Sequence, residues 1–302
     1  MQSFKKEFVT FLRNLQDSIC QTIEQEDTSG IFKEEKWERP EGGGGRTRII
    51  SEGAVFEKGG VNTSEVSGIL PPSMVDYLNV ENNEFFACGL SLVLHPKNPH
   101  VPTVHANYRY FELYDSEGNI IDHWFGGGSD LTPYYLIDED VIHFHQILKN
   151  ESDRFDKTYY SKYKSACDNY FYNHHRKEAR GIGGLFYDYL RSNKKEPNHW
   201  FNFVTAQAGI FLESYIPIVK KNKNIAFSNN EKKWQEIRRG RYVEFNLIHD
   251  KGTLFGLKTN GRIESILMSL PPTVRWDYNH SPQVGSREYE LLNVLKNPKD
   301  WI

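Results

Sequence analysis

Five polar side chains recur at even spacing along two segments that read as β-strands, 85–95 and 103–113. They are Ser91, His95, His105, Asn107 and Arg109. Alternate side chains of a strand share one face, so the members from each segment project together. We therefore expect a polar face where a buried sheet would carry valine and isoleucine. Polar groups held in such a place need a ligand or hydrogen-bonding partners.

The two segments are joined by a stretch that contains three prolines, which predicts a hairpin connection. In an antiparallel pair centred on this stretch, residues whose numbers sum to about 200 lie opposite each other. His95 then faces His105, and Ser91 faces Arg109.

Three chemistries fit this face. Two imidazoles could hold a metal ion, although a first shell needs a third or fourth ligand. Arg109, Asn107 and Ser91 could bind a carboxylate while a histidine moves protons. The face could also be the solvated side of an edge hairpin. Tyr108, Tyr110 and Phe111 flank the polar set, which makes a fully wet face less natural and favours ligand binding.

A second candidate is the glycine run 126–128, followed two residues later by Asp130. Three glycines allow a ligand to approach the backbone closely, and Asp130 would supply a positioned carboxylate. Alternatively, Asp130 caps a turn at 131–133. Nearby, His143 and His145 are two residues apart, so on a helix at most one of them can serve a given site.

Two groups of arginines could bind anions. The glycine run 42–45 leads into Arg46 and Arg48, and no Gly-Lys-Ser/Thr follows, so a Walker loop is excluded. A flexible loop is predicted there, either a lid over an anionic ligand or a solvated linker. The second group could pair with ligand carboxylates or with nearby glutamates. Its members are Arg238, Arg239, Arg241, Arg262 and Arg275.

The helices that must support these side chains are outlined by periodicity. Apolar residues recur at helical spacing from residue 4 to 23, which predicts an amphipathic helix within residues 1–30 that packs on the body of the protein. Ser152 is expected to be the N-cap of one or two helices, and one of His174 and His175, which fall in that region, is expected to be a packed or capping residue. Helices are expected at 138–150, 152–179 and 203–221.

The last third of the chain is expected to return to strands. Alternation at 242–249 and 253–258, the turn signal Asn260-Gly261 and the segment 262–270 predict an antiparallel meander. Strands at both ends with helices between them indicate an α+β fold. No linker divides the chain, so residues 1–302 are expected to form a single domain.

Composition limits the class of protein. The chain has 302 residues with a formal net charge of −3, which argues against a polyanion binder that works by phosphate neutralisation. Three cysteines without a CxxC spacing make a disulfide framework improbable and favour a reducing compartment. No apolar run approaches the roughly 18 residues of a membrane span, and no signal peptide is evident. A cytoplasmic protein is expected.

Several collinear motifs together make the chain resemble the oxygen-dependent coproporphyrinogen III oxidase family, from residue 42 to 301. The motifs are Gly-Gly-Gly-Gly-Arg-Thr-Arg (42–48), His-Pro-Lys-Asn-Pro (95–99), Pro-Thr-Val-His-Ala-Asn-Tyr-Arg (102–109), Trp-Phe-Gly-Gly-Gly-Ser-Asp-Leu-Thr-Pro (124–133), His-Phe-His (143–145), Arg-Gly-Ile-Gly-Gly-Leu-Phe (180–186), Arg-Arg-Gly-Arg-Tyr-Val-Glu-Phe-Asn (238–246), Glu-Ser-Ile-Leu-Met-Ser (264–269) and Lys-Asp-Trp (299–301).

The resemblance implies that two propionates of coproporphyrinogen III are oxidatively decarboxylated to vinyl groups in haem biosynthesis, giving protoporphyrinogen IX. It implies O2 as co-substrate, no organic cofactor, an optional divalent metal and a homodimer. The implied fold is a large flat antiparallel β-sheet covered by helices on both faces. Two rival hypotheses are a histidine-ligated metal oxygenase or hydrolase acting on another anionic substrate, and a tetrapyrrole carrier without catalysis.

The resemblance also implies roles for individual residues. It assigns His105 as proton donor, Asp130 as catalytic carboxylate and Arg109 as the propionate clamp. Substrate-binding positions fall on Ser91, Asn107, Tyr108, Arg109, Asn260, Gly261 and Arg262. Asn260 departs from the glycine that many relatives carry. Metal-type positions fall on His95, His105, His145 and His175.

Overall fold

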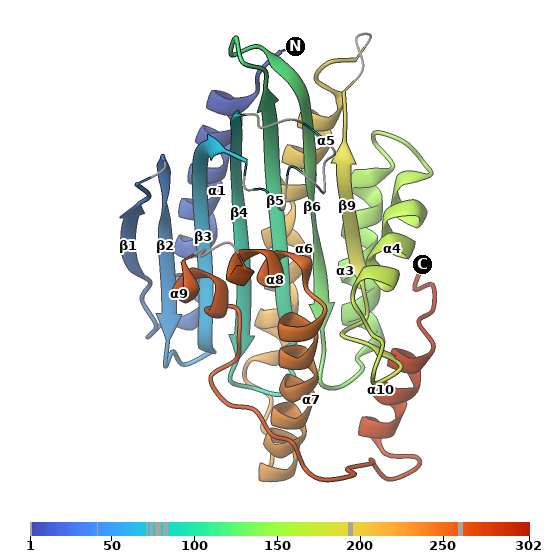
Figure 1. The fold of residues 1–302 in the computed structure, drawn as a ribbon. Coiled ribbons are helices and arrows are strands. Elements are labelled where there is room, and N and C mark those ends of the chain that lie inside the picture. The colour runs from blue at the N-terminus through green and yellow to red at the C-terminus, as the bar shows by residue number, and fades with distance from the viewer. Residues whose placement is uncertain are drawn as a thin grey trace.

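The computed structural model describes residues 2–40, 42–70, 72, 75, 80, 84–192, 196–258 and 262–302. Within them, seven strands form one antiparallel sheet in the order β1-β2-β3-β4-β5-β6-β9 (Figure 1). The strands are β1 (Lys33–Glu38), β2 (Gly43–Ser51), β3 (Phe56–Ile69), β4 (Glu84–Pro96), β5 (Thr103–Tyr114), β6 (Ile120–Thr132) and β9 (Gly184–Leu190). The predicted α+β class is confirmed.

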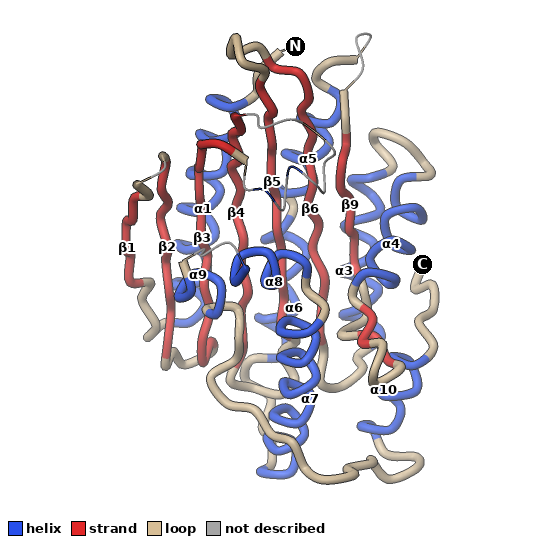
Figure 2. The backbone as a smooth tube through the Cα atoms, in the orientation of Figure 1, coloured by secondary structure: helices blue, strands red, loops and turns tan. Residues whose placement is uncertain are grey.

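Helices cover both faces of the sheet, which Figure 2 shows as a single layer of strands with helices in front and behind. Behind it lie α1 (Lys5–Asp27), α3 (Asp138–Ser152), α5 (His199–Gly209) and α6 (Phe211–Asn222). In front lie α7 (Asn229–Ile248), α8 (Lys251–Lys258) and α9 (Ile263–Leu267), while α4 (Tyr159–Tyr170) lies along β9 and α10 (Arg287–Lys296) lies below α4. No described helix is long and apolar enough to cross a bilayer.

The N-terminal helix is confirmed as a packed element. Phe8, Leu12, Leu15, Ile19 and Ile23 recur three or four residues apart and are all buried, so one stripe of α1 faces the sheet. The helix ends at a left-handed C-cap residue, the usual geometry for a helix stop.

The hairpin that carries the polar face is confirmed, but its register differs by two residues from the prediction. Ser91 lies opposite Asn107 rather than Arg109, and Arg109 lies opposite Gly89. The numbers of paired residues sum to 198 rather than 200 because the turn is centred on Pro99, so Val93 rather than His95 lies opposite His105. A shift of two keeps each side chain on the same face, so the predicted face survives.

The glycine run 42–45 is not a flexible loop, because Gly43 begins β2 and the run pairs with strands on both sides. Arg46 and Arg48 are not free lid residues either. Both guanidinium groups form 2.8 Å ion pairs with Asp17 of α1, and Arg48 also pairs with Glu34 at 2.8 Å. Position 45 of this edge requires glycine, because Trp37 lies over it and a Cβ would be 2.4 Å from the indole ring.

The predicted meander in the last third is wrong. The segments 242–249, 253–258 and much of 262–270 are helical, and α7 begins with a capping box in which the Ser228 hydroxyl and the Glu231 side chain cap each other's backbone N–H. The turn signal at Asn260 and Gly261 lies outside the described residues.

The middle of the chain also departs from the predicted helices in detail. Ser152 closes α3 rather than capping the next helix, and its hydroxyl donates to Leu148 O at 2.8 Å. Two short strands, β7 (Tyr172–Asn173) and β8 (Glu178–Ala179), replace the end of the predicted helix 152–179. The segment 203–221 is shared between α5 and α6.

Candidate active site

The polar face lies on β4, β5 and β6, beneath α7 and α8 (Figure 1). Arg109 is flanked on its two neighbouring strands by Gly89 and Gly126, so its side chain has space on both sides. A Cβ on Gly126 would lie 2.8 Å from Arg109 Nε and 2.6 Å from Asp188 Oδ1. Glycine at position 126 is therefore what allows these two charged groups to meet.

Arg109 and Asp188 form the more open half of the site. Arg109 Nη2 lies 2.8 Å from Asp188 Oδ2, and Arg109 Nη1 donates to Asn107 Oδ1 at 3.1 Å. The side chains of Arg109 and Asp188 are 38% and 27% exposed. Because both groups reach solvent, an incoming carboxylate can replace Asp188 on the guanidinium at little desolvation cost.

His105, Asp130 and Arg180 form the closed half. Asp130 lies opposite His105 across the strand pair and accepts a 2.8 Å hydrogen bond from His105 Nδ1. Arg180 Nη2 donates to both oxygens of Asp130 at 2.8 Å. Asp130 is 1% exposed and Arg180 is 3% exposed, whereas the His105 side chain keeps about a fifth of its surface accessible. Asp130 therefore acts on a ligand through His105.

Arg180 is held rigidly by aromatic side chains. Its guanidinium carbon lies 4.0 Å from the ring centroid of Phe171, 4.6 Å from Tyr242 and 4.9 Å from Phe245. Arg180 Nη1 also donates to Asn246 Oδ1 of α7 at 2.9 Å. The helix that covers the polar face thereby fixes the cation that neutralises Asp130.

These contacts keep Asp130 ionised. Burial alone would raise the pKa of Asp130, but the charge of Arg180 and the hydrogen bond from His105 lower that pKa below its ordinary value of 3.8. An ionised Asp130 accepts from Nδ1, so Nδ1 of His105 carries the proton. Nε2 is then the ring nitrogen left to exchange a proton with a ligand.

The other three predicted histidines lie in separate surroundings. His95 is fully buried and bonds through Nε2 to Ser269 O at 2.8 Å, and burial lowers its pKa well below the ordinary value. His145 bonds to Ile182 O at 3.1 Å, and burial lowers its pKa to about 3. No group of three possible metal ligands occurs among the described side chains. Metal binding by the four histidines stays a prediction.

His175 belongs to a cluster around Glu244 on α7. Its Nε2 donates to Glu244 Oε2 at 2.9 Å, and Arg176 forms a bidentate pair with the same carboxylate. Burial alone would raise the pKa of Glu244, but hydrogen bonds from Arg176, His175 and Trp276 lower it to about 2. This cluster gives His175 a structural partner on α7.

The predicted substrate positions divide between the two faces. Ser91 lies opposite Asn107, so both belong to the polar face and both are half-buried. Tyr108 has the opposite parity and is 1% exposed, so only its backbone borders this face. Arg262 lies at the β1–β2 edge, where it pairs with Glu35 and approaches Thr47 Oγ1 at 3.5 Å. Asn260 and Gly261 are outside the described residues.

Two side chains of this site were missed by sequence reasoning. Arg180 opens the motif 180–186, but nothing in a sequence reveals that an arginine is buried against three rings. Asp188 lies on β9, whose hydrogen bonding to β6 places it beside Gly126. The sequence indicated Asp188 only by placing one acidic residue within the otherwise aromatic run 186–189.

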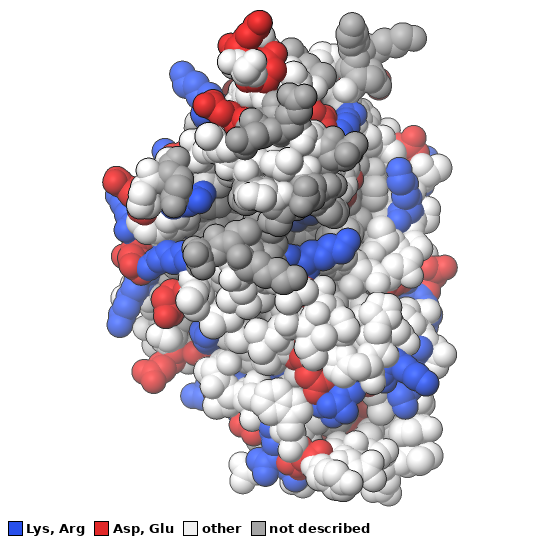
Figure 3. Space-filling view, in the orientation of Figure 1, with Lys and Arg blue, Asp and Glu red and all other residues white. Residues whose placement is uncertain are grey.

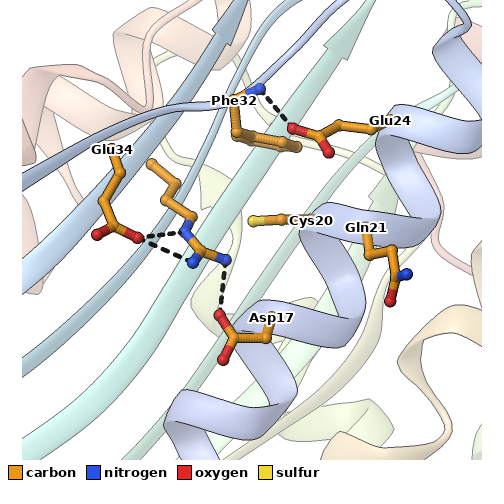
Figure 4. Close-up of a pocket in the computed structure, with 7 residues that line it drawn as sticks. Asp17, Cys20, Gln21, Glu24, Phe32 and Glu34 are labelled. Atoms are coloured by element: carbon orange, nitrogen blue, oxygen red, sulfur yellow. Dashed lines mark hydrogen bonds and ion pairs between the residues drawn. The ribbon is translucent and has the colours of Figure 1, made fainter.

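A cavity of about 300 Å³ lies elsewhere, between α1 and the strands at the sheet edge (Figure 4). Asp17, Glu24 and Glu34 line it together with Arg48, whose guanidinium is already paired with two of these acids. An acid-rich cavity does not suit a polyanionic ligand. Basic and acidic side chains are interspersed on the side seen in Figure 3, so anion binding must depend on particular arginines.

Comparison with known proteins identifies the family of the chain. A family model described as coproporphyrinogen III oxidase matches residues 7–301. The oxygen-dependent coproporphyrinogen-III oxidase of Drosophila melanogaster is 52% identical over 96% of the chain and 76% of its own length. The chloroplastic enzymes of Glycine max and Arabidopsis thaliana are each 49% identical over 99% of the chain and 80% of their own length. The chain therefore belongs to the coproporphyrinogen III oxidase family.

Proposed function

We propose that the polar face carries out the oxygen-dependent oxidation of coproporphyrinogen III, the reaction for which the relatives are named. Two propionates are converted to vinyl groups, and the product is protoporphyrinogen IX. In each round a propionate loses CO2 and a β-hydrogen with its electron pair. One O2 takes up that hydrogen and one further proton to become H2O2, so each round consumes one proton.

The observation that carries this proposal is a partly exposed arginine, Arg109, paired with an accessible carboxylate, on the same face as a second, buried carboxylate that holds His105. Arg109 can bind a substrate propionate by the two parallel hydrogen bonds that its guanidinium offers. Asn107 and Ser91 lie beside it on the same face. Arg262 would hold a second propionate at the sheet edge, about where Glu35 now pairs with it.

The two carboxylates then take different roles. Asp188, released from Arg109 by the propionate, is free to accept a pyrrole N–H and to favour an electron-rich ring that O2 can attack. The peroxide formed on the ring takes the β-hydrogen as a proton, and its C–O bond then breaks to release HOO⁻. CO2 leaves, and the electron pair of the broken C–C bond forms the vinyl double bond. His105 supplies the proton of each round from Nε2, and Asp130 stabilises the charged imidazole through Nδ1.

The reaction so described needs O2 as co-substrate and no organic cofactor. We further propose that the protein acts as a homodimer in the cytoplasm. Three free, buried cysteines support a reducing compartment. Sedimentation velocity at micromolar concentration tests the dimer, and a single species of monomer mass would refute it.

The decisive experiment mixes the protein with coproporphyrinogen III under anaerobic conditions, admits air and identifies the products by mass. The proposal predicts two successive losses of CO2 and H2 and the appearance of H2O2. A carrier would bind porphyrinogen without consuming O2. A metal-dependent oxygenase would lose activity in chelator, whereas full activity in chelator supports the scheme without a metal.

A variant pair tests the assignment of Asp188. Asp188→Asn should lower kcat at least about a hundredfold, because general base catalysis is worth roughly 10² to 10⁴. Asp122→Asn is the matched control, since Asp122 of β6 forms a similar 2.8 Å ion pair with Arg191, which directly follows β9. Equal activities of the two variants would remove Asp188 from the mechanism.

A further inference from the structure

The motif 299–301 at the C-terminal end has no role in the mechanism above, yet it contacts the loop that brings Arg180 to Asp130. That loop comprises residues 180–183, which connect β8 to β9, together with Gly184, the first residue of β9. Figure 1 shows the C-terminal segment beside α4, on the β9 side of the sheet. We propose that Trp301 is a positioning residue that fixes this loop and, through it, the pairing of Arg180 with Asp130.

The loop is tied directly to the strand that carries Asp130. Leu131 N donates to Gly183 O at 3.1 Å, and Ile182 N donates to Leu131 O at 3.0 Å. Gly184 lies opposite Asp130 in the sheet. A displacement of the loop therefore moves the backbone on both sides of Asp130 as well as the Arg180 side chain.

The loop has little means of holding itself in place. It contains three glycines, which have the largest conformational freedom of any residue. Gly183 has φ +82°, and a Cβ there would lie 2.5 Å from Asp168 Oδ1, so a side chain is not tolerated at this point. Order in such a segment depends on contacts made to it from outside.

One indole N–H and one imidazole N–H supply such contacts, both at the same backbone carbonyl of the loop. Ile182 O accepts from Trp301 Nε1 at 3.2 Å and from His145 Nε2 at 3.1 Å. The rings of Trp301 and His145 stack with centroids 6.3 Å apart and planes 22° apart. The two stacked rings therefore hold the Ile182 carbonyl together, and we call this pair, Trp301 and His145, the brace.

The tail that presents Trp301 is itself anchored. The buried Lys164 of α4 donates to Lys299 O at 2.8 Å while it pairs with Asp168 at 2.6 Å. The Lys299 ammonium lies 4.4 Å from the Trp301 ring centroid. The last residues of the chain are thus fixed on α4 by a charged contact, with the indole directed at the loop.

The inference rests on the proposed function, so the test uses one readout that needs no turnover. Hydrogen exchange of the Leu131 and Ile182 amides should accelerate about fivefold in Trp301→Phe, which keeps a ring but loses one neutral hydrogen bond. Acceleration should exceed tenfold in Trp301→Ala. Amides of the distant strand pair β2–β3 should be unchanged, which separates a local effect from a general loss of stability.

The second readout is kinetic. In both variants kcat for coproporphyrinogen III should fall in parallel with the exchange effect while KM stays constant, because Trp301 touches no part of the polar face. Trp276→Phe is the matched control. Its indole N–H also makes one hydrogen bond, to Glu244 at 2.9 Å, but it does not contact the loop.

Each outcome decides a different question. Unchanged exchange at Leu131 and Ile182 would overturn the brace, whatever the enzyme does. Faster exchange with an unchanged kcat would overturn its role in positioning. If the wild-type chain does not turn over coproporphyrinogen III, the proposed function fails, and the exchange measurement still decides whether Trp301 fixes the loop.

Discussion

Replacing Arg180 by glutamine tests whether the closed half of the site is an electrostatic unit. The side chains of Arg180 and Asp130 are each 2% exposed, so removing the cation leaves a carboxylate that water cannot reach. Breaking a buried ion pair from one side costs about 3–5 kcal/mol. We expect a loss of unfolding free energy of this size in urea, followed by far-ultraviolet circular dichroism.

The pH dependence of that loss has a defined sign. Without Arg180, burial raises the pKa of Asp130, so the variant is least destabilised at low pH and loses stability as the pH rises. The double variant Arg180→Gln/Asp130→Asn should recover at least about 2 kcal/mol relative to the sum of the single variants, because no orphaned charge remains.

A surface pair supplies the control. Arg191→Gln removes a guanidinium from an exposed pair with Asp122 and should cost less than about 1 kcal/mol. If Arg180→Gln costs no more than Arg191→Gln, or if the single losses simply add in the double variant, the reasoning about the closed half is refuted.

Three other features give measurable expectations: the propionate clamp, an acid on α7 and the thiols. Arg109→Ala should raise KM for coproporphyrinogen III by about tenfold or more, and an unchanged KM would move the clamp to another arginine. The folded pKa of Glu244 is lowered from 4.5 to about 2, so its stabilisation is present above pH 4.5 and is lost as the pH falls. Glu244→Gln should therefore flatten the acid limb of the melting-temperature profile, and parallel profiles would contradict this. Burial raises the thiol pKa of Cys20, Cys88 and Cys167, so none should be alkylated by iodoacetamide at about pH 8 until the protein unfolds; rapid labelling of the native protein would show the burial to be wrong.

The polar face could be predicted because side chains alternate between the two faces of a strand, so an error of two residues in the register leaves each side chain on its face. Ser91, His105 and Arg109 keep their face whichever even shift the hairpin adopts, so the identity of the face was safe while the partners were not. Gly126, opposite Arg109, was visible in the sequence as the start of the run 126–128, but its use in admitting Asp188 depends on β9, which is far away in the chain.

The helices of the last third were missed because local alternation was given more weight than the helix start signal. Tyr242-Val-Glu-Phe-Asn alternates as a strand does, although it lies in α7, where Tyr242, Val243, Phe245 and Asn246 are all buried. A helix enclosed on most sides loses its simple polar and apolar stripes. The capping box at Ser228 and Glu231 was the available sign of the correct structure.

The order of strands has a consequence for synthesis on the ribosome. Strands β1 to β6 each pair with their neighbour in sequence, so the emerging chain can add them one hairpin at a time. Only β9 must wait until α3 and α4 have been made, and Arg180 and Asp188 arrive with it. A nascent chain can therefore build most of its sheet while it still lacks both groups, so the pairs Arg180–Asp130 and Arg109–Asp188 form only when the last strand has joined.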